Sequence, residues 1–183
     1  SKEFRTETWA WEGTAKKYLS TSWTGYAVRS IMTPHAEDTA PGMGVDPGRT
    51  VRFAYAAEAH TFGYDTSVAQ AGTTTQAGML LWRSEGQGGS SPSSTSVDVT
   101  LPVGSGVTHI LSTTEVDDHA QPTTTTAHGQ VGVDAFIRSR STYAINEAAW
   151  ILRPCETWTQ GEGDDTVYNH KLQSYDGVAS TWG

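Results

Sequence analysis

Three groups of acidic and imidazole side chains are the first places in this 183-residue sequence where metal chemistry could occur. They are His35 with Glu37 and Asp38, Asp117 and Asp118 with His119, and Glu162 with Asp164 and Asp165. A tight metal site needs three or four ligands at fixed geometry, and none of these groups has the HxH, HExxH or EF-hand spacing. We therefore expect solvated loop acids and no cofactor. Asp164 and Asp165 are the candidates for a stabilising Ca2+ ion.

The chain contains no recognisable motif for nucleophilic or acid–base catalysis. There is no G-x-S-x-G elbow, and Cys155, the single cysteine, follows Pro154 at the end of an apolar segment, which favours a buried structural thiol. No pair stands out among the 20 acidic residues as a glycosidase pair. The glycines from Gly86 to Gly89 are not followed by the Lys-Ser/Thr of a phosphate-binding loop. The sequence predicts a protein that is not an enzyme.

The seven tryptophans are the most informative side chains, because this aromatic residue serves either as core filler or as a contact surface for a sugar or another protein. Trp82 and Trp150 stand within apolar runs and are predicted to be core. Trp9 and Trp11 share one face of a predicted strand near a terminus, and Trp158 and Trp182 lie in polar surroundings. These last four are the predicted interface or stacking residues.

The elements that must position these side chains are predicted to be strands. Only 17% of the residues are charged, and the polar remainder is largely Thr, Ser and Gly, which is typical of strands and turns. Apolar residues alternate with polar ones in short segments bounded by turn residues. The predicted strands are Arg5 to Trp11, Trp23 to Met32, Thr50 to Ala56, Gly78 to Arg83, Val97 to Leu101, Val107 to Thr113, Val131 to Arg138, Ala149 to Arg153 and Thr166 to Leu172.

Nine such strands predict an all-β, single-domain antiparallel β-sandwich of jelly-roll type spanning residues 1–183. At most two short helices are expected, at Thr14 to Leu19 and at Asn146 to Trp150. Four long polar connections are predicted to be loops that contact a partner: Pro34 to Gly48, Glu58 to Ala77, Ser84 to Ser96 and Asp117 to Gly129. The terminal segment 1–12 is predicted to dock on a neighbouring subunit.

Charge and composition exclude several partners. A net charge of −8 disfavours a phosphate-binding surface, so nucleic acid is not expected as a partner. The longest apolar run, Met79 to Trp82, is far shorter than the roughly 20 residues of a spanning helix, so no membrane insertion is expected. One cysteine allows no intrachain disulfide, and the opening Ser1-Lys2 favours synthesis in a cytoplasm after removal of an initiator Met.

The segment from Tyr143 to Pro154 looks like the closing strand region of β modules in bacteriophage virion proteins. The whole chain, which is disulfide-free and rich in Thr, Gly and Ala, resembles the head-decoration or tail-associated proteins of such particles. This resemblance implies many symmetric copies with flat, self-complementary contact surfaces. It also implies self-association, other virion proteins as partners, and location in the virion after synthesis in the host cytoplasm. It assigns no functional residue.

Two other functions remain open at this stage. A carbohydrate-binding module or lectin, which could also be a receptor-binding virion protein that contacts a host glycan, would stack exposed Trp and Tyr on sugar rings. A pore-forming protein would need an amphipathic segment that can leave the core, and the polar stretches Thr73 to Gln76 and Thr123 to Thr126 fit that role poorly.

Overall fold

A computed structural model describes residues 2–33, 49–86, 93–146, 151–163 and 166–175. In these residues the chain is all β, without a helix, as the sequence predicts. The strands are β1 (Arg5–Glu12), β2 (Ala15–Thr33), β3 (Arg49–Tyr64), β4 (Thr74–Gly86), β5 (Ser93–Leu101), β6 (Val107–Val116), β7 (Pro122–Gln130), β8 (Ile137–Asn146), β9 (Ile151–Gly161) and β10 (Tyr168–Leu172).

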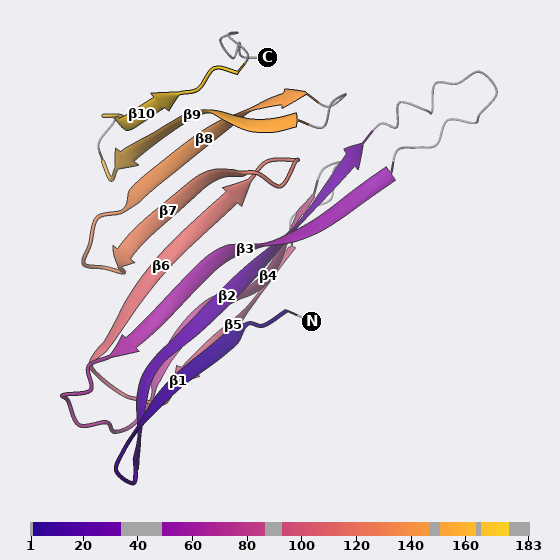
Figure 1. Cartoon of the computed structure of the whole chain (residues 1–183). Coiled ribbons are helices and arrows are strands. Elements are labelled where there is room, and N and C mark those ends of the chain that lie inside the picture. Colours follow the sequence, from indigo (N-terminus) through magenta and orange to yellow (C-terminus); the bar gives the residue numbers. More distant parts are fainter. Residues whose placement is uncertain (1, 34–48, 87–92, 147–150, 164–165, 176–183) are drawn as a thin grey trace.

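The ten strands form one mixed sheet, in the order β10-β9-β8-β7-β6-β3-β2-β4-β5 (Figure 1). Strand β1 is outside this path and pairs with the first half of β2. The second half of β2 pairs in parallel with β4 from Tyr26 to Ser30, and the other pairings are antiparallel. Strand β2 therefore joins three neighbours and organises the N-terminal half of the sheet.

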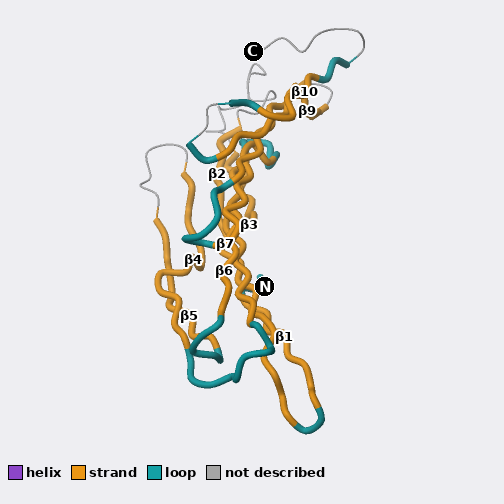
Figure 2. The backbone as a smooth tube through the Cα atoms, turned by 90° about the vertical axis from the view of Figure 1, so that its left-hand side faces the viewer, coloured by secondary structure: helices purple, strands orange, loops and turns teal. Residues whose placement is uncertain are grey.

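The β4–β5 hairpin separates from the plane of the sheet and covers one of its faces, so this half of the molecule has two layers (Figure 2). The core lies between the layers because alternate residues of β2 and β3 point toward the hairpin. Its main cluster consists of Trp23, Phe62, Met79, Val99 and Leu101, which are all at most 6% exposed. A second cluster joins Tyr18, Tyr64 and Val103. We call the side of the sheet that bears Trp23 and Phe62 the covered face.

Close backbone approach at Gly25 brings the two layers together. A Cβ atom at this position would lie 2.8 Å from the Leu80 carbonyl oxygen and 2.9 Å from the Leu80 Cβ, which real side chains do not tolerate. Beside it, Trp23 Nε1 donates a hydrogen bond to the same carbonyl oxygen at 2.8 Å. The missing side chain and the indole donor thus fix β4 against β2.

The predicted sandwich is not confirmed, because the strands belong to one sheet and β2–β4 is parallel. The predicted helix at Thr14 to Leu19 is wrong: Ala15 to Leu19 lies in β2, where pairing with β1 across a hairpin turn at Gly13 (φ +61°) overrides the weak local helix signal. In the second predicted helix, Asn146 ends β8, and residues 147–150 lie outside the described part.

The predicted strand from Val131 to Arg138 is also wrong over most of its length. Residues 131–136 form the turn between β7 and β8, and the polar stretch Thr123 to Thr126, predicted to be loop, lies in β7. The turn follows from Gly129 (φ +57°) and Gly132 (φ +79°), and the Asp134 carboxylate accepts the backbone N–H of Gln130 at 2.7 Å.

The predicted loops are shorter in the structure where it describes them. Within Glu58 to Ala77, the ends belong to β3 and β4. Residues 34–48, and 87–92 of the Ser84 to Ser96 connection, lie outside the described part.

Candidate interaction surface

A pair of histidines stands at the border of the covered region, where β3 meets β6. His60 Nδ1 lies 2.9 Å from His109 Nε2, and His60 Nε2 lies 3.3 Å from Glu58 Oε2. His60 is only 6% exposed, and the His109 ring stacks on Phe62 at a centroid distance of 4.4 Å. Burial, followed by the charge of His60, lowers the pKa of His109 from its ordinary value of 6.5.

The hydrogen bond from His60 similarly lowers the pKa of Glu58, although burial opposes this effect. These two shifts favour an ionised Glu58 beside a neutral His109. With both imidazoles neutral, one hydrogen lies between His109 and His60 and a second lies between His60 and the Glu58 carboxylate.

An ionic cluster lies further along β2 and β4. The Glu85 carboxylate accepts a hydrogen bond from the Tyr55 hydroxyl at 2.8 Å and from Arg83 Nε at 2.8 Å, and it lies 3.7 Å from Arg29 Nη1. Arg29 Nε in turn donates to Asp118 Oδ1 at 2.7 Å, which ties β2 to the turn after β6. Burial and the bond to Glu85 raise the pKa of Tyr55 to about 12. The charged groups of this cluster pair with one another, so the cluster holds β2, β3, β4 and the turn after β6 together.

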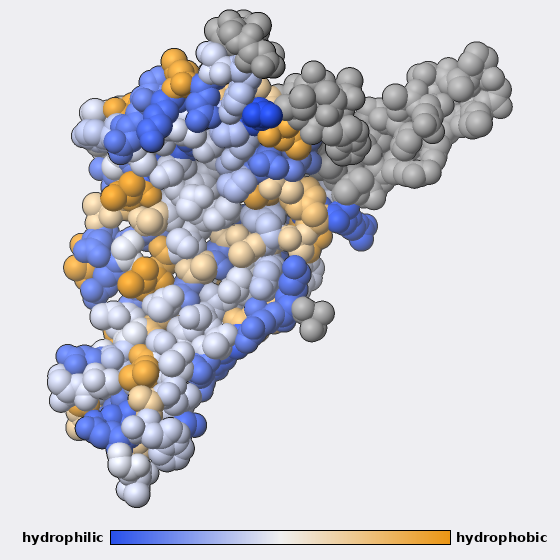
Figure 3. Space-filling model, viewed as in Figure 1, coloured by the Kyte–Doolittle hydropathy of each residue, from blue (hydrophilic) through white to orange (hydrophobic). Residues whose placement is uncertain are grey.

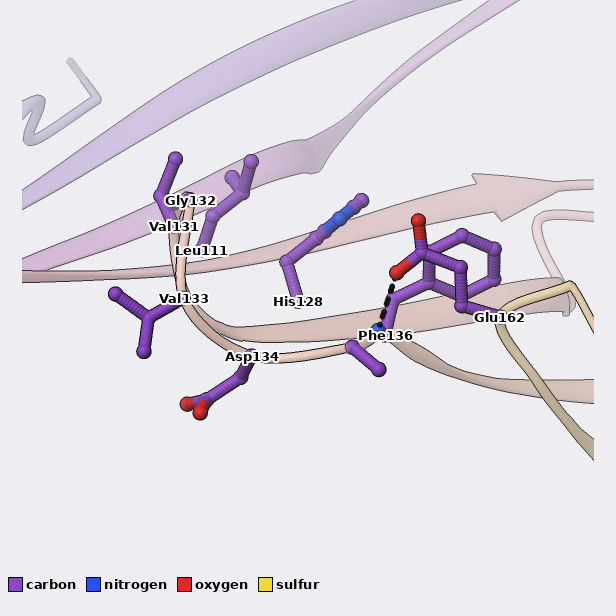
Figure 4. Close-up of a pocket in the computed structure, with 9 residues that line it drawn as sticks. Leu111, His128, Val131, Gly132, Val133, Asp134, Phe136 and Glu162 are labelled. Atoms are coloured by element: carbon purple, nitrogen blue, oxygen red, sulfur yellow. Dashed lines mark hydrogen bonds between the residues drawn. The ribbon is translucent and has the colours of Figure 1, made fainter.

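An open cavity of about 440 Å³ lies at the β7–β8 turn (Figure 4). Its lining includes Leu111, His128, Phe136 and Glu162, together with the valines of the turn. The Phe136 backbone N–H donates to Glu162 Oε2 at 3.2 Å, as Figure 4 shows, and the His128 and Phe136 rings lie 5.8 Å apart. Val133 is 70% exposed beside it. The cavity offers an apolar rim with one imidazole and two carboxylates, those of Asp134 and Glu162.

The face of the sheet opposite the covered face is built from hydroxyl and small side chains. Directly paired residues share a face, so the strand registers define rows that cross the sheet. The rows are Thr8, Ser20, Gly63 and Thr108; Thr6, Ser22, Thr61, Ile110 and Gln130; Thr24, Ala59, Ser112, Ala127, Ile137 and Gly161; Thr114, Thr125, Ser139 and Thr159; and Ser141 with Thr157, while Tyr168 and Lys171 of the edge strand β10 border the last two rows. We call this set the hydroxyl face. It spans seven strands: β1, β2, β3, β6, β7, β8 and β9.

None of the residues that make up the hydroxyl face is charged, and none is fully buried. Figure 3 shows the side of the molecule on which this face lies: its broad middle is pale, and the strongly hydrophilic colours gather toward the margins. At the β1 margin, Glu3 Oε1 accepts a hydrogen bond from Thr6 Oγ1 at 3.0 Å. Solvent-facing surfaces of soluble domains are commonly about 25–35% charged, so this surface is unusual.

The sheet beyond β6 has almost no core of its own. Among the described residues from Asp117 to Tyr175 whose exposure is known, only Thr126 is buried. Two buried polar atoms there, Arg140 Nε and Glu156 Oε2, have no hydrogen-bond partner. Buried polar groups in native proteins are nearly always bonded, so these atoms call for a partner.

The predicted contact tryptophans fall into different environments. Trp11 is 70% exposed on β1. Trp9 is half-buried, with Tyr18 at 5.5 Å and Lys16 Nζ 4.1 Å from its ring centroid. Trp158 is half-buried on β9, opposite Arg140 of β8. Trp182 lies outside the described residues, as does Trp150.

Trp82, predicted to be core, is 38% exposed, because it lies where β4 leaves the covering layer to pair with β2 at Tyr26. The structure places Trp9 and Trp11 together on β1 and Trp158 on the distant β9, so the predicted residues form no single site. Segment 5–12 of the predicted docking terminus pairs with the chain's own β2. Docking of this segment on a neighbour stays a prediction.

The candidate ligand groups have mostly structural surroundings. Asp117 Oδ1 accepts the backbone N–H groups of His119 and Gln121, both at 2.8 Å, and so shapes the β6–β7 turn. Asp164 and Asp165 lie outside the described residues, and so do His35, Glu37 and Asp38. Within the part of the chain that the structure describes, no three His, Cys, Asp or Glu residues gather as a metal site would require. Cys155 is half-buried, with Sγ 3.2 Å from Thr142 Oγ1.

The sequence reasoning missed the histidine pair and the hydroxyl face. His60 and His109 are 49 residues apart and meet only through the β3–β6 register. The hydroxyl face has a visible signal in the alternation of Thr and Ser at Thr6, Thr8, Ser20, Ser22 and Thr24. That signal shows only that one side of a strand is polar. The absence of charge across several strands can be seen only when the strand registers are known.

No family model, curated protein sequence or solved structure is similar to this chain. None of the residues that the structure describes belongs to a helix that could cross a membrane.

Proposed function

We propose that this chain is a non-enzymatic structural subunit of a symmetric protein assembly, of the class of bacteriophage capsid-decoration or tail-associated proteins. The observation that carries the proposal is the coreless sheet from β7 to β10, in which only Thr126 is buried among the described residues of known exposure. A lone sheet gains little from hydrophobic burial, and its backbone and side chains still lose entropy on folding. Contacts with other subunits would supply the missing burial.

Two further features support a subunit over an isolated protein. The buried and unbonded Arg140 Nε and Glu156 Oε2 sit in this same region, where a neighbouring chain could supply a partner atom only if the side chains that cover them repack on assembly. Apolar side chains there are strongly exposed, among them Val133 at 70%, Ile137 at 58% and Leu172 at 71%. Contact with neighbouring subunits would bury these side chains, of which Ile137 and Leu172 lie on opposite faces of the sheet. Location in a virion is part of the same proposal.

The carbohydrate-binding alternative rests on Trp11, whose exposure of 70% leaves the indole free to stack on a sugar ring. Trp9 is less suited, because Tyr18 and Lys16 already contact its ring. A glycan array with the wild-type chain and Trp11→Ala tests this alternative. Sugar binding that Trp11→Ala abolishes would establish a lectin function.

Hydrogen exchange of the full chain tests the structural role. The amides of β7–β10 should exchange quickly in dilute protein and become protected at high concentration or on purified particles from the native source, because assembly supplies the cover. Mass spectrometry of those particles should find the chain in many copies. Strong protection of β7–β10 in a dilute monomer, together with absence from every particle, would overturn the proposal.

A further inference from the structure

The hydroxyl face has the features of a contact surface for a second copy of this chain. Its side chains are Ser and Thr, apart from Gln130 and two each of Ala, Gly and Ile, so most of them have similar heights above the sheet. Sheets with small side chains of even height can stack face to face at about 10 Å with interdigitated side chains. Nothing in the described part of the chain covers this face, since the β4–β5 hairpin packs on the other side.

The absence of charge favours a second copy over a partner of another kind. The chain carries a net charge of −8, so two copies repel one another wherever charged surfaces meet. Around a twofold axis each residue lies close to its own counterpart, so any charge near the axis would face the same charge. The hydroxyl face avoids this penalty except at its β10 edge, where Lys171 borders the row of Ser141 and Thr157. An acidic or basic partner would instead be matched by charges of the opposite sign.

The size of the face also suits a stable homodimer. Seven strands spaced about 4.8 Å apart, with rows that cover about six residues of about 3.3 Å each, give a surface of roughly 30 by 20 Å. The accessible area of such a surface is close to the ~800 Å² that each partner buries in a standard interface.

We infer that the hydroxyl face binds the hydroxyl face of a second copy, as a symmetric sheet-on-sheet contact. This inference rests on the proposed structural role and names its first partner. The contact leaves the β7–β8 cavity free for other subunits, together with the part of the sheet beyond β6 that the β4–β5 hairpin does not cover. Because the interface has no ion pairs, salt should not weaken it.

Two lysine substitutions test the contact: Ala59→Lys on β3 and Ala127→Lys on β7, both at exposed positions of the same row. The matched control is Ser96→Lys, an exposed position on β5 in the covering layer. Sedimentation equilibrium of the full chain should show a dimer whose dissociation constant rises at least ~100-fold in Ala59→Lys and Ala127→Lys, because each lysine loses water in the interface. Ser96→Lys should leave it unchanged.

The sign of the charge makes the test specific. A lysine lowers the net negative charge, so general repulsion between copies predicts tighter association, whereas burial in the interface predicts weaker association. Dimerisation unchanged in Ala59→Lys and Ala127→Lys would overturn the inference and leave the structural role intact. A wild-type chain that stays monomeric but is found on particles would also overturn the dimer contact and leave the structural role intact. A monomer absent from every particle would remove the proposed function as well.

Discussion

His60 and His109 share a hydrogen bond between their rings, with 2.9 Å from Nδ1 of His60 to Nε2 of His109. The pair joins two strands that are distant in the sequence, at the point where the two-layered half of the molecule becomes a single sheet. Only one hydrogen can lie between the two nitrogen atoms, so the bond is lost when both imidazoles are protonated. The charged groups around the pair are Glu58 on β3 and Arg83 on β4, which lies 4.0 Å from Glu58.

The histidine pair predicts that the protein loses stability in mild acid. The pKa of His109 is lowered in the fold, so the unfolded chain binds more protons as the pH falls below 6.5, and the free energy of unfolding decreases. This contribution is fully present above pH 6.5 and is lost as the pH falls through the lowered value. Urea unfolding between about pH 7.5 and pH 5 should show the decrease, and His109→Gln should flatten it.

His128→Gln provides the control for that experiment, because it removes a histidine from β7 outside the pair. It should retain the acid sensitivity of the wild type. A His109→Gln variant with an unchanged pH profile would contradict the assignment.

Tyr55 predicts a second effect at the alkaline end. Its pKa is raised to about 12, first by burial and then by the hydrogen bond to Glu85. The unfolded tyrosine loses its proton near pH 10, so its contribution to stability is complete below pH 10 and is lost as the pH rises through about 12. Tyrosinate absorbance of the native protein should show a late-titrating component that is smaller in Tyr55→Phe, and Tyr18, whose pKa is also raised by burial, should still titrate late in the variant. If wild type and variant titrate alike, the raised pKa of Tyr55 is contradicted.

Close packing at Gly25 predicts that this residue tolerates no side chain. Gly25→Ala would place Cβ 2.8 Å from the Leu80 carbonyl oxygen, so β4 must move away from β2. We expect a loss of about 1–3 kcal/mol in the free energy of unfolding, measured by urea denaturation. Gly78→Asn is the matched control, because nothing lies within 4 Å of a Cβ there and asparagine tolerates its positive φ of 69°. Equal losses in both variants would show that Gly25 is not a packing contact.

The strands themselves could be predicted from local patterns, and their arrangement could not. The alternation of Val51, Phe53 and Tyr55 with polar or small residues predicts a strand, whichever neighbour that strand pairs with. The sandwich, in contrast, was inferred from strand number, which does not distinguish two sheets from one sheet with a folded-over hairpin. That distinction depends on Gly25 and Leu80, which are 55 residues apart and meet only in three dimensions.

The misplaced strand at Val131 shows a different limit. Its valines alternate with Gly132 and Asp134 as a strand would, but Gly132 adopts a positive φ and Asp134 bonds to Gln130, so turn chemistry decides the local structure. The adjacent Thr123 to Thr126 has no apolar alternation and is a strand nonetheless, because both neighbours, β6 and β8, pair with it. A sheet without a core does not require apolar residues at alternate positions, so its strands lack the alternation from which strands are predicted.

Two tryptophans offer the most direct comparison between core and contact surface. Trp23 is 6% exposed and donates a hydrogen bond to the Leu80 carbonyl, whereas Trp11 is 70% exposed. Trp23→Phe leaves that carbonyl buried without its donor, so we expect a loss of about 1–3 kcal/mol in the free energy of unfolding. Trp11→Ala should change it by no more than about 0.5 kcal/mol, since exposed positions contribute little.

The same two variants separate folding from association when dimerisation is measured beside urea denaturation. Trp23→Phe should weaken the fold without a direct effect on the dimer, because its side chain points to the covered face and away from the hydroxyl face. Trp11→Ala that weakens association but not folding would confirm the predicted contact role of this residue. An unchanged association would make Trp11 a solvent-exposed residue of β1, and it would leave the hydroxyl face as the surface through which copies meet.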